Sequence, residues 1–422
     1  MKAIYLLIIL LLSLQSYSIY ALQTHPLAKL WKVNDTEVPI LLEFEKNLTA
    51  IDDILRPILE EDEFISSFGG TYIDQIEDKL YLVVNTVNES KVDQLLKLPK
   101  INPYEDFLYF FKTNNSMSRM KYNFDKIAAI TQSFKPKDVL IYIDMSLNNV
   151  VVYLFNALYF NNTKYINAVD PFNPSIIYEY TPSVPQNLLR PQHDARFLNI
   201  RILGGDGLYI KNKNNDSDNW LCSAGFWTSD RYNPNKKYII IAGHCVENNF
   251  DHAMVFFQPW NSTQPYVSYI GSSVYNPINF YDIGIIHVEN EDFFPIPAIK
   301  NTDADQYKEL IIIDGIPVFS HGVHICKSGR TSHFTCGYVQ GLNGIYSTGD
   351  RFALEIIITS TDVKGGDSGG PVLSFVSPQD LFLVVVHGIV INRGSSAQSI
   401  DTIFHVIKEN TGLDLTLYQQ VH

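Results

Sequence analysis

The sequence predicts a chain that is mainly β in its C-terminal half and mixed α and β in its N-terminal half. Aromatic residues make up 13% of the 422 residues, and many Ile, Val and Tyr favour strands. Residues 202–422 contain short apolar runs separated by Gly, Asn and Asp turns, whereas residues 22–201 show more helical periodicity and contain no cysteine. We therefore expect two units of different architecture.

The N-terminal half contains one pattern twice. In each copy an aromatic-x-Asp strand and a Val-Val strand flank a polar turn, which predicts hairpins at residues 68–84 and 139–153. Helical spacing predicts helices at residues 41–58, 88–96 and 116–134. The segment from about residue 172 to residue 200 contains four prolines and shows little periodicity, which predicts an exposed linker.

The most informative motif is Gly-Gly-Asp-Ser-Gly-Gly-Pro at residues 365–371. Two glycines follow Ser368 and two precede Asp367, so the backbone can make the tight turn that exposes the Ser368 hydroxyl. The N–H groups of Gly366 and Ser368 are expected to converge on one point and form an oxyanion hole. Such a donor is worth roughly 3–4 kcal/mol of transition-state stabilisation.

A serine hydroxyl is inert at neutral pH without a base, so this motif needs a histidine and a carboxylate elsewhere. An apolar run, Ile-Ile-Ile-Ala-Gly-His-Cys, ends in a small-residue turn that presents His244. Asp282 stands at the start of an alternating apolar segment, Tyr-Asp-Ile-Gly-Ile-Ile. The chain order of the three candidate catalytic residues is therefore His, Asp, Ser.

These motifs resemble those of the chymotrypsin-like serine proteases, which use the same chain order. The duplicated hairpins and the stretch 202–210 are similar to the streptogrisin and alpha-lytic protease group with its N-terminal pro-region. The resemblance implies double six-stranded antiparallel barrels near 202–300 and 310–398, with the active site between them and a C-terminal helix at 399–410. It also implies an α+β pro-region before the protease domain.

The domain organisation follows from the resemblance and the termini. Lys2, the apolar run 4–12 and a small residue at Ala21 predict a signal peptide at residues 1–21. Residues 22–201 are expected to form the pro-region, which assists folding of the protease domain and then inhibits it. Residues 202–422 are expected to form the protease domain, with cleavage after Arg201. Secretion agrees with seven Asn-x-Ser/Thr sequons, headed by Asn34, Asn47, Asn88, Asn114, Asn161, Asn215 and Asn261.

All four cysteines lie in the C-terminal half, which in a secreted chain predicts two disulfides with three pairings possible. Pairing of sequence neighbours agrees with the resemblance, namely Cys222–Cys245 and Cys326–Cys336. A zinc site is the rival reading because several histidines lie near these cysteines, but the spacing fits no standard finger. We expect neither a metal nor an organic cofactor.

Two further features concern the surroundings of the nucleophile. The resemblance gives Asp367 an ion-pair partner after the third cysteine, where this chain has Lys327, although a solvated Lys327 remains the alternative. The candidate pocket residues include Ile391-Asn392-Arg393, which stands where the family has small residues, and they leave the preference for an acidic or a basic substrate side chain open. They are Asp362, Lys364, Ile391, Asn392 and Arg393.

The formal net charge of −13 argues against a nucleic-acid-binding protein. We expect a secreted, extracellular serine endopeptidase made as a zymogen, monomeric and free of the membrane once the signal peptide is removed. Its partners would be protein or peptide substrates and its own pro-region as an intramolecular inhibitor. A catalytically inactive homologue acting as a secreted binding protein remains the alternative. An esterase is disfavoured, because α/β-hydrolases run Ser, Asp, His.

Overall fold

The computed structural model describes residues 24–77, 79–179, 200–211, 219–246, 253–260, 268–302, 304, 306–392 and 394–419. Three sheets and six α-helices make up this part of the chain, and its many strands confirm the mainly β fold class. The predicted signal peptide, residues 1–21, lies outside the described residues. Five short 3-10 helices lie at Asp35–Glu37 (η1), Glu89–Lys91 (η2), Asn102–Phe107 (η3), Asp170–Phe172 (η4) and Gly243–Cys245 (η5).

The N-terminal region follows a short helix, α2 (Pro26–Trp31), and is built from two copies of one arrangement. Each copy is a long helix, an antiparallel hairpin, a short helix and a third strand parallel to the second strand of the hairpin. The first copy comprises α3 (Val38–Leu59), β1 (Phe68–Ile76), β2 (Lys79–Thr86), α4 (Val92–Leu96) and β3 (Leu108–Lys112). The second comprises α5 (Met117–Phe134), β4 (Val139–Asp144), β5 (Asn149–Leu154), α6 (Thr163–Val169) and β6 (Ser175–Tyr178).

The predicted linker is shorter than expected. Residues 175–178 form β6, because Ile176 and Ile177 pair with the apolar strand β5. At the other end, Ile200–Gly204 form β7, which pairs in parallel with β15 (Phe293–Lys300). The bond after Arg201 lies within this paired strand, where Ile202 is fully buried and Arg201 pairs with Glu309. A paired strand is a poor substrate for proteolysis in the folded chain.

The first barrel closes because its two edge strands, β9 and β10, follow each other directly in the chain. Its sheet order is β10-β11-β14-β13-β12-β8-β9, and β9 leads through residues 224–226 directly into β10, so both ends of the sheet are one stretch of backbone. Strand β23 (Leu415–Leu417) adds to the edge of β10. The strands are β8 (Gly207–Lys211), β9 (Asn219–Ser223), β10 (Trp227–Asp230), β11 (Asn233–Ile241), β12 (Met254–Gln258), β13 (Ser268–Tyr275) and β14 (Gly284–Val288).

The second barrel is a ring of six antiparallel strands, in the order β17-β18-β19-β22-β21-β20 and back to β17. The ring comprises β17 (His324–Gly329), β18 (His333–Ser347), β19 (Phe352–Thr359), β20 (Pro371–Phe375), β21 (Leu383–Asn392) and β22 (Ser396–Ser399). Outside the ring, β16 (Glu309–Gly315) pairs in parallel with β21. Strand β15 pairs with the other edge of β16, and β7 pairs with β15. The expected first-barrel range of 202–300 was therefore too wide, because both ends of that range pair with the second sheet.

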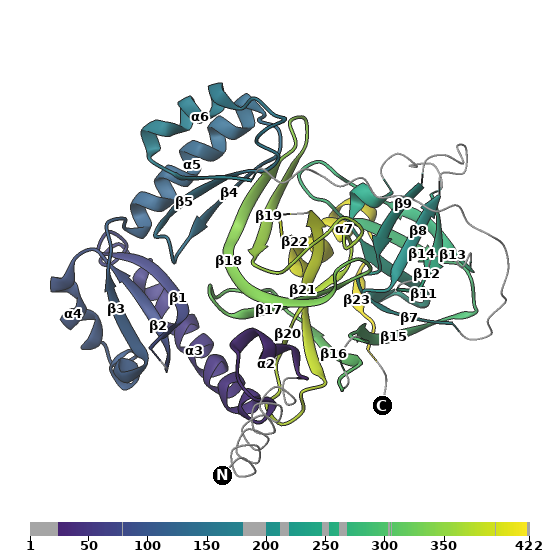
Figure 1. Ribbon diagram of the computed structural model, residues 1–422, viewed down its shortest axis with the longest axis horizontal. Helices are drawn as coiled ribbons and strands as arrows, with labels where there is room; N and C mark the ends of the chain where they lie inside the picture. Colours follow the sequence, from purple (N-terminus) through teal and green to yellow (C-terminus); the bar gives the residue numbers. More distant parts are fainter. Residues whose placement is uncertain are drawn as a thin grey trace, which may run out of the picture.

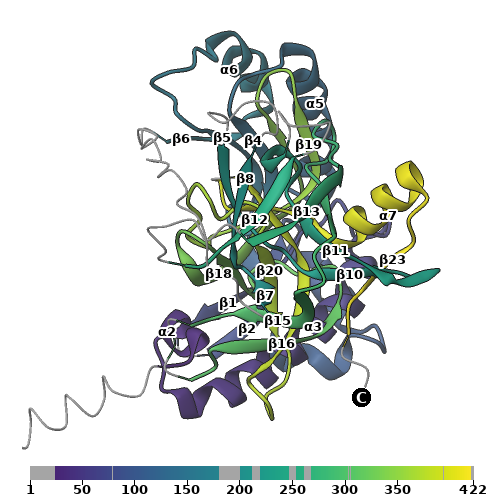
Figure 2. The ribbon, with the colours of Figure 1, turned by 90° about the vertical axis from the view of Figure 1, so that its right-hand side faces the viewer.

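The C-terminal helix α7 (Ile400–Thr411) forms where it was expected, with Ser399 as its N-cap residue and Gly412 ending it in a left-handed conformation at φ 73°. Its buried face includes Ile400, Ile403 and Ile407, and Figure 2 shows the helix at the side of the barrels.

The N-terminal region packs along the second barrel (Figure 1). Strand β4 pairs with the far end of the long, curved β18, with Ile141 opposite Ile345, so the second hairpin extends the sheet of the second barrel. Figures 1 and 2 both show α2 and α3 at one end of the molecule and α5 and α6 at the other. Leu27, Val38 and Leu42 belong to one apolar core with residues of both barrels, so the two units share buried surface rather than a thin contact.

Candidate active site

The histidine motif is held in a turn that the first barrel builds. Strand β11 ends at Ile241, and the 3-10 turn η5 then presents His244. A side chain at Gly243 would approach the carbonyl oxygens of Ile283 and Pro277 to 2.7 Å, so this position needs glycine for the turn to pack. The Cys222–Cys245 disulfide ties the turn to β9, and the second disulfide joins Cys326 to Cys336 across β17 and β18.

His244 and Asp282 form a two-point pair. The backbone N–H of His244 donates to Oδ1 of Asp282 at 2.8 Å, and Nδ1 of the imidazole lies 2.6 Å from Oδ2. Asp282 precedes β14 and is 14% exposed, whereas the His244 side chain is 36% exposed. Burial lowers the pKa of His244, but the charge and hydrogen bond of Asp282 together outweigh it, so the pKa lies above its ordinary 6.5.

Asp282 fixes the tautomer of His244. A carboxylate at Nδ1 holds the proton on that nitrogen and leaves Nε2 as the basic atom. None of the described residues hydrogen-bonds to Nε2 of His244. Among the described residues, the imidazole is therefore oriented through Nδ1 alone.

Ser368 lies in the loop between β19 and β20 and packs against the disulfide that carries the histidine turn. Its carbonyl oxygen accepts a hydrogen bond from the N–H of Ser223 at 2.8 Å and lies 3.9 Å from Sγ of Cys245. Gly369 takes φ 88°, and a side chain there would come within 2.4 Å of the Ser223 carbonyl oxygen. No hydrogen bond joins the Ser368 hydroxyl to His244 within the described residues, and such contacts tighten when substrate binds.

The predicted oxyanion donors are the N–H groups of Gly366 and Ser368. Gly366 takes φ 101°, a left-handed conformation that favours glycine. Across the described ranges, neither the N–H of Gly366 nor that of Ser368 donates to a protein acceptor. Both groups therefore keep their capacity to bind an anion.

Asp367 is the centre of a buried polar network. Its carboxylate lies 3.3 Å from Nζ of Lys327, and both side chains are fully buried. The N–H groups of Thr331 and Ser332 donate to Oδ1, and that of Lys364 donates to Oδ2. Burial raises the pKa of Asp367, but Lys327 and the hydrogen bonds from Ser332 and Lys364 outweigh it and hold the pKa below its ordinary value.

Among the described pocket candidates, the two charged side chains pair with each other. Asp362 and Lys364 are about 60% exposed and pair with each other at 3.2 Å, so each neutralises the other. Ile391 is buried in β21. Arg393 and the side chain of Asn392 lie outside the described residues.

One group of metal-ligand types lies at the site. An imidazole nitrogen of His244 and the sulfur atoms of Cys222 and Cys245 lie within 4.8 Å of one another. The two sulfurs are bonded to each other in a disulfide, so they are not thiolate ligands.

Sequence reasoning missed four residues that hold the site. Ser223 and Thr331 donate from their hydroxyls to the carbonyls of Gly366 and Gly365, and Ser332 binds Asp367. Gln398 of the second barrel accepts the N–H of Asp282 from the first, at 3.4 Å. Only Ser223, adjacent to a disulfide cysteine, had a local signal that could have been used.

Comparison with known proteins gives limited matches. No family model matches the chain. Serine protease 1 of Rarobacter faecitabidus is 43% identical over 49 residues, which are 12% of this chain and only 9% of that protein's length. Protease A of Thermobifida fusca has 19% identity and a TM-score of 0.39, and the alpha-lytic protease homolog N4 has 18% and 0.37. Each alignment covers 52% of this chain and 100% of the other.

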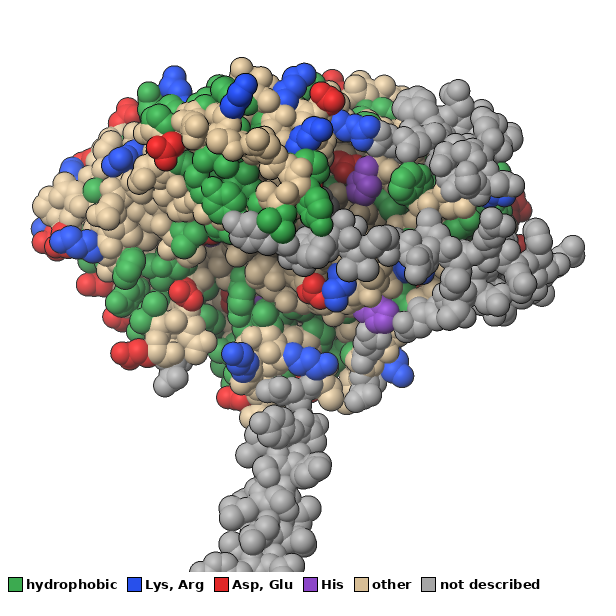
Figure 3. Space-filling model, turned by 45° about the horizontal axis from the view of Figure 1, so that its top comes forward, with side chains coloured by type: hydrophobic (Ala, Val, Ile, Leu, Met, Phe, Trp, Pro, Cys, Tyr) green, Lys and Arg blue, Asp and Glu red, His purple; other side chains and the backbone are tan. Residues whose placement is uncertain are grey.

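The matched proteins are named as proteases, and each match is a similarity of part of this chain to them. Because the sequence identities and TM-scores are low, we argue its function from its own residues. In the described part of the chain, no helix has the length and apolarity needed to cross a membrane. Lys and Arg side chains are interspersed with Asp and Glu on the face shown in Figure 3.

Proposed function

We propose that this chain is a secreted serine endopeptidase, made as a zymogen, that cleaves peptide bonds through an acyl-enzyme. The observation that carries the proposal is the two-point His244–Asp282 pair, whose Nε2 has no hydrogen-bond partner among the described residues. His244 lies in a turn joined by a disulfide to the strand on which the Ser368 loop packs.

The chemistry follows from this arrangement. Oγ of Ser368 attacks the scissile carbonyl carbon, and Nε2 of His244 takes the hydroxyl proton. The N–H groups of Gly366 and Ser368 bind the oxyanion. His244 then returns the proton to the leaving amine, and water hydrolyses the acyl-enzyme by the same steps. Asp282 stabilises the imidazolium, which agrees with the raised pKa of His244.

We propose further that residues 22–201 act as a pro-region that assists folding and inhibits the protease domain in the same molecule. Its support is the shared apolar core and the pairing of β4 with β18. An N-terminal region that completes a sheet and a core of the catalytic unit stabilises that unit in the folded state. Secretion is supported by the two disulfides, which form in oxidising compartments.

The test is secretion of the full-length chain and of its Ser368→Ala variant from a host that removes signal peptides. We expect the wild type to separate into two fragments and to hydrolyse a denatured protein substrate, and the variant to do neither. If both chains separate alike and neither hydrolyses substrate, processing is external and the chain is an inactive homologue instead.

A further inference from the structure

The direction of one peptide group decides whether the oxyanion site exists. The N–H of Gly366 belongs to the peptide group between Gly365 and Gly366. In a planar trans peptide the N–H points opposite to the carbonyl, so whatever holds the Gly365 carbonyl also aims the Gly366 N–H. Glycine on both sides makes rotation of this group easy, so the loop needs an external hold.

Thr331 supplies that hold from the turn between β17 and β18. Its Oγ1 donates to the carbonyl oxygen of Gly365 at 2.8 Å. Its own N–H donates to Oδ1 of Asp367 at 2.8 Å, so the turn is anchored to the same loop at a second point. Thr331 is therefore placed to fix the peptide group that carries the Gly366 N–H.

Ser223 holds the next carbonyl in the loop. Its buried hydroxyl donates to the carbonyl oxygen of Gly366 at 2.8 Å and accepts the N–H of Arg330 at 2.9 Å. Because the hydroxyl has one proton and Arg330 is a donor, that proton is directed to Gly366. The N–H of Ser223 also binds the carbonyl of Ser368, so this residue contacts both residues that supply oxyanion donors.

We propose that Thr331 and Ser223 are positioning residues. Thr331 holds the Gly365 carbonyl away from the oxyanion site and thereby aims the N–H of Gly366 into it, and Ser223 fixes the following peptide group, between Gly366 and Asp367. This inference rests on the proposed protease function. Neither residue acts on the substrate; both act through the backbone of the 365–368 loop.

The test compares Thr331→Val, which removes the hydroxyl at nearly constant shape, with Thr331→Ser, which retains it. We expect Thr331→Val to lower kcat by roughly 10- to 100-fold with little change in KM, because an oxyanion contact acts mainly in the transition state. A peptide boronic acid, whose tetrahedral adduct places an oxygen in the oxyanion site, should lose affinity by a similar factor. Thr331→Ser should keep both kcat and the boronic acid affinity near those of wild type.

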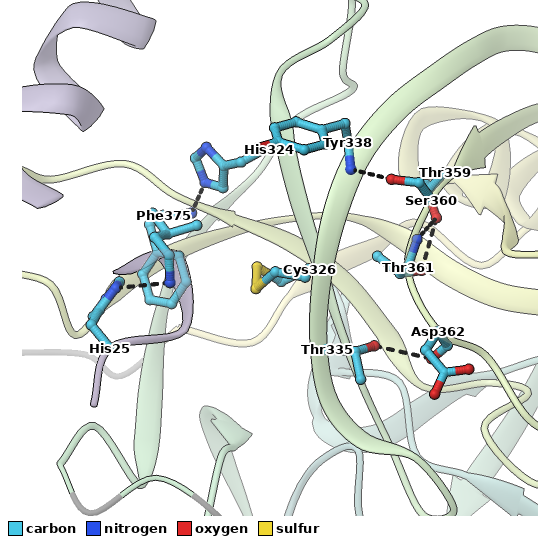
Figure 4. Close-up of a disulfide and its surroundings, with 12 residues drawn as sticks. His25, His324, Cys326, Thr335, Tyr338, Thr359, Ser360, Thr361, Asp362 and Phe375 are labelled. Carbon is cyan, nitrogen blue, oxygen red and sulfur yellow. Dashed lines mark hydrogen bonds between the residues drawn. A yellow bond between two sulfur atoms is a disulfide. The ribbon is translucent and has the colours of Figure 1, made fainter. Parts of the chain in front are cut away.

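Thr335 offers a matched control. Its hydroxyl also donates to a backbone carbonyl of the same loop region, that of Asp362, at 3.0 Å (Figure 4). Thr335→Val should leave kcat and boronic acid affinity within a factor of a few of wild type. Ser223→Ala should act in the same direction as Thr331→Val, and thermal unfolding reports whether that buried change also destabilises the chain.

The outcomes separate the two proposals. If the wild type hydrolyses substrate and Thr331→Val matches it in kcat and inhibitor affinity, the positioning role is wrong and the protease function stands. If Thr331→Val and Thr335→Val lose activity equally, the effect is general to the loop and the inference is also wrong. A folded, processed wild type with no hydrolysis removes both proposals.

Discussion

Two histidine–carboxylate pairs in this molecule have the same geometry and opposite surroundings. In each pair the histidine backbone N–H donates to one carboxylate oxygen and Nδ1 faces the other oxygen. The first is His244 with Asp282, both in the first barrel. The second is His324 of the second barrel with Glu45 of α3, where the backbone bond is again 2.8 Å.

The pairs differ at Nε2. For His324 this nitrogen accepts the N–H of Phe375 at 3.0 Å (Figure 4). The ring is buried, and it packs against Trp31 and Phe375. For His244, none of the described residues hydrogen-bonds to Nε2, and the side chain is 36% exposed. An oriented imidazole acts as a general base only when its second nitrogen can reach a substrate or nucleophile. The second pair instead joins the N-terminal region to the second barrel.

The largest expected contrast comes from removing each imidazole. His244→Ala should lower kcat by roughly a million-fold, because the nucleophile loses its base, and should leave the unfolding temperature near that of wild type. His324→Ala leaves Glu45 buried without its partner and should cost about 3–5 kcal/mol of unfolding free energy. Its catalytic constants per folded molecule should stay within a factor of a few of wild type.

Substrate hydrolysis normalised to folded protein, with urea unfolding of each variant, measures this contrast. Loss of turnover in a fully folded His324→Ala protein would contradict the assignment of that pair to structure.

Substitution of Asp282 should affect catalysis and substitution of Glu45 should affect stability, with smaller effects than removal of the histidines. Asp282→Asn keeps the geometry but favours the wrong tautomer of His244, so kcat should fall about 10⁴-fold. Glu45→Gln replaces a buried charge by an amide of equal size and should change stability rather than kcat. Steady-state kinetics and thermal unfolding of the two isosteric variants form the comparison. Equal effects on kcat would show that the two pairs are not functionally distinct.

Acid should weaken the contact between the two regions. Burial lowers the pKa of His25 to about 4, against an opposing effect of Asp35 and a reinforcing one of His324. Burial and Arg56 likewise lower the pKa of His321 to about 4. The unfolded chain takes up these protons near pH 6.5 and the folded chain only near pH 4. Each histidine should therefore remove on the order of 3 kcal/mol of stability as the pH falls between these values.

Urea unfolding of the full-length chain at pH 7, 5.5 and 4.5 measures the slope of the unfolding free energy against pH. His25→Gln and His321→Gln should each flatten it, whereas the exposed His405 in α7 provides a control substitution, His405→Gln. A slope unchanged in both buried variants would contradict the prediction.

The smallest expected effect is on the pH dependence of turnover. His244 must be neutral to act as a base, and its pKa is raised by Asp282. The value of kcat/KM should therefore rise about tenfold per pH unit below that pKa and level off above it, with a midpoint higher than 6.5. A midpoint below 6.5 would contradict the raised pKa.

The local features of the fold were predictable from the sequence, and the contacts between distant segments were not. Alternating apolar residues and turn signals gave both hairpins of the N-terminal region, and amphipathic spacing gave α3, α5 and α7, because these elements depend on neighbouring residues. The parallel pairing of β7 with β15 and of β16 with β21 depends on segments far apart in the chain, and no local pattern encodes it.

The same distinction holds at the site. His244, Asp282 and Ser368 stand in motifs whose glycines and apolar runs are visible in the sequence. Thr331 and Ser223 act through single hydroxyls on backbone carbonyls, and neither has a motif of its own. Glu45 and His324 are separated by 279 residues. Their pairing becomes visible only when α3 is packed against the second barrel.

The most direct test of the central claim is labelling of the secreted chain with a fluorophosphonate, followed by mass mapping of the modified peptide. We expect one adduct, on Ser368, in the wild type and in His324→Ala, and a loss of labelling in His244→Ala. That result would show that only the first pair activates a nucleophile. An adduct on another residue, equal labelling of His244→Ala, or no adduct on the processed wild type would contradict the account.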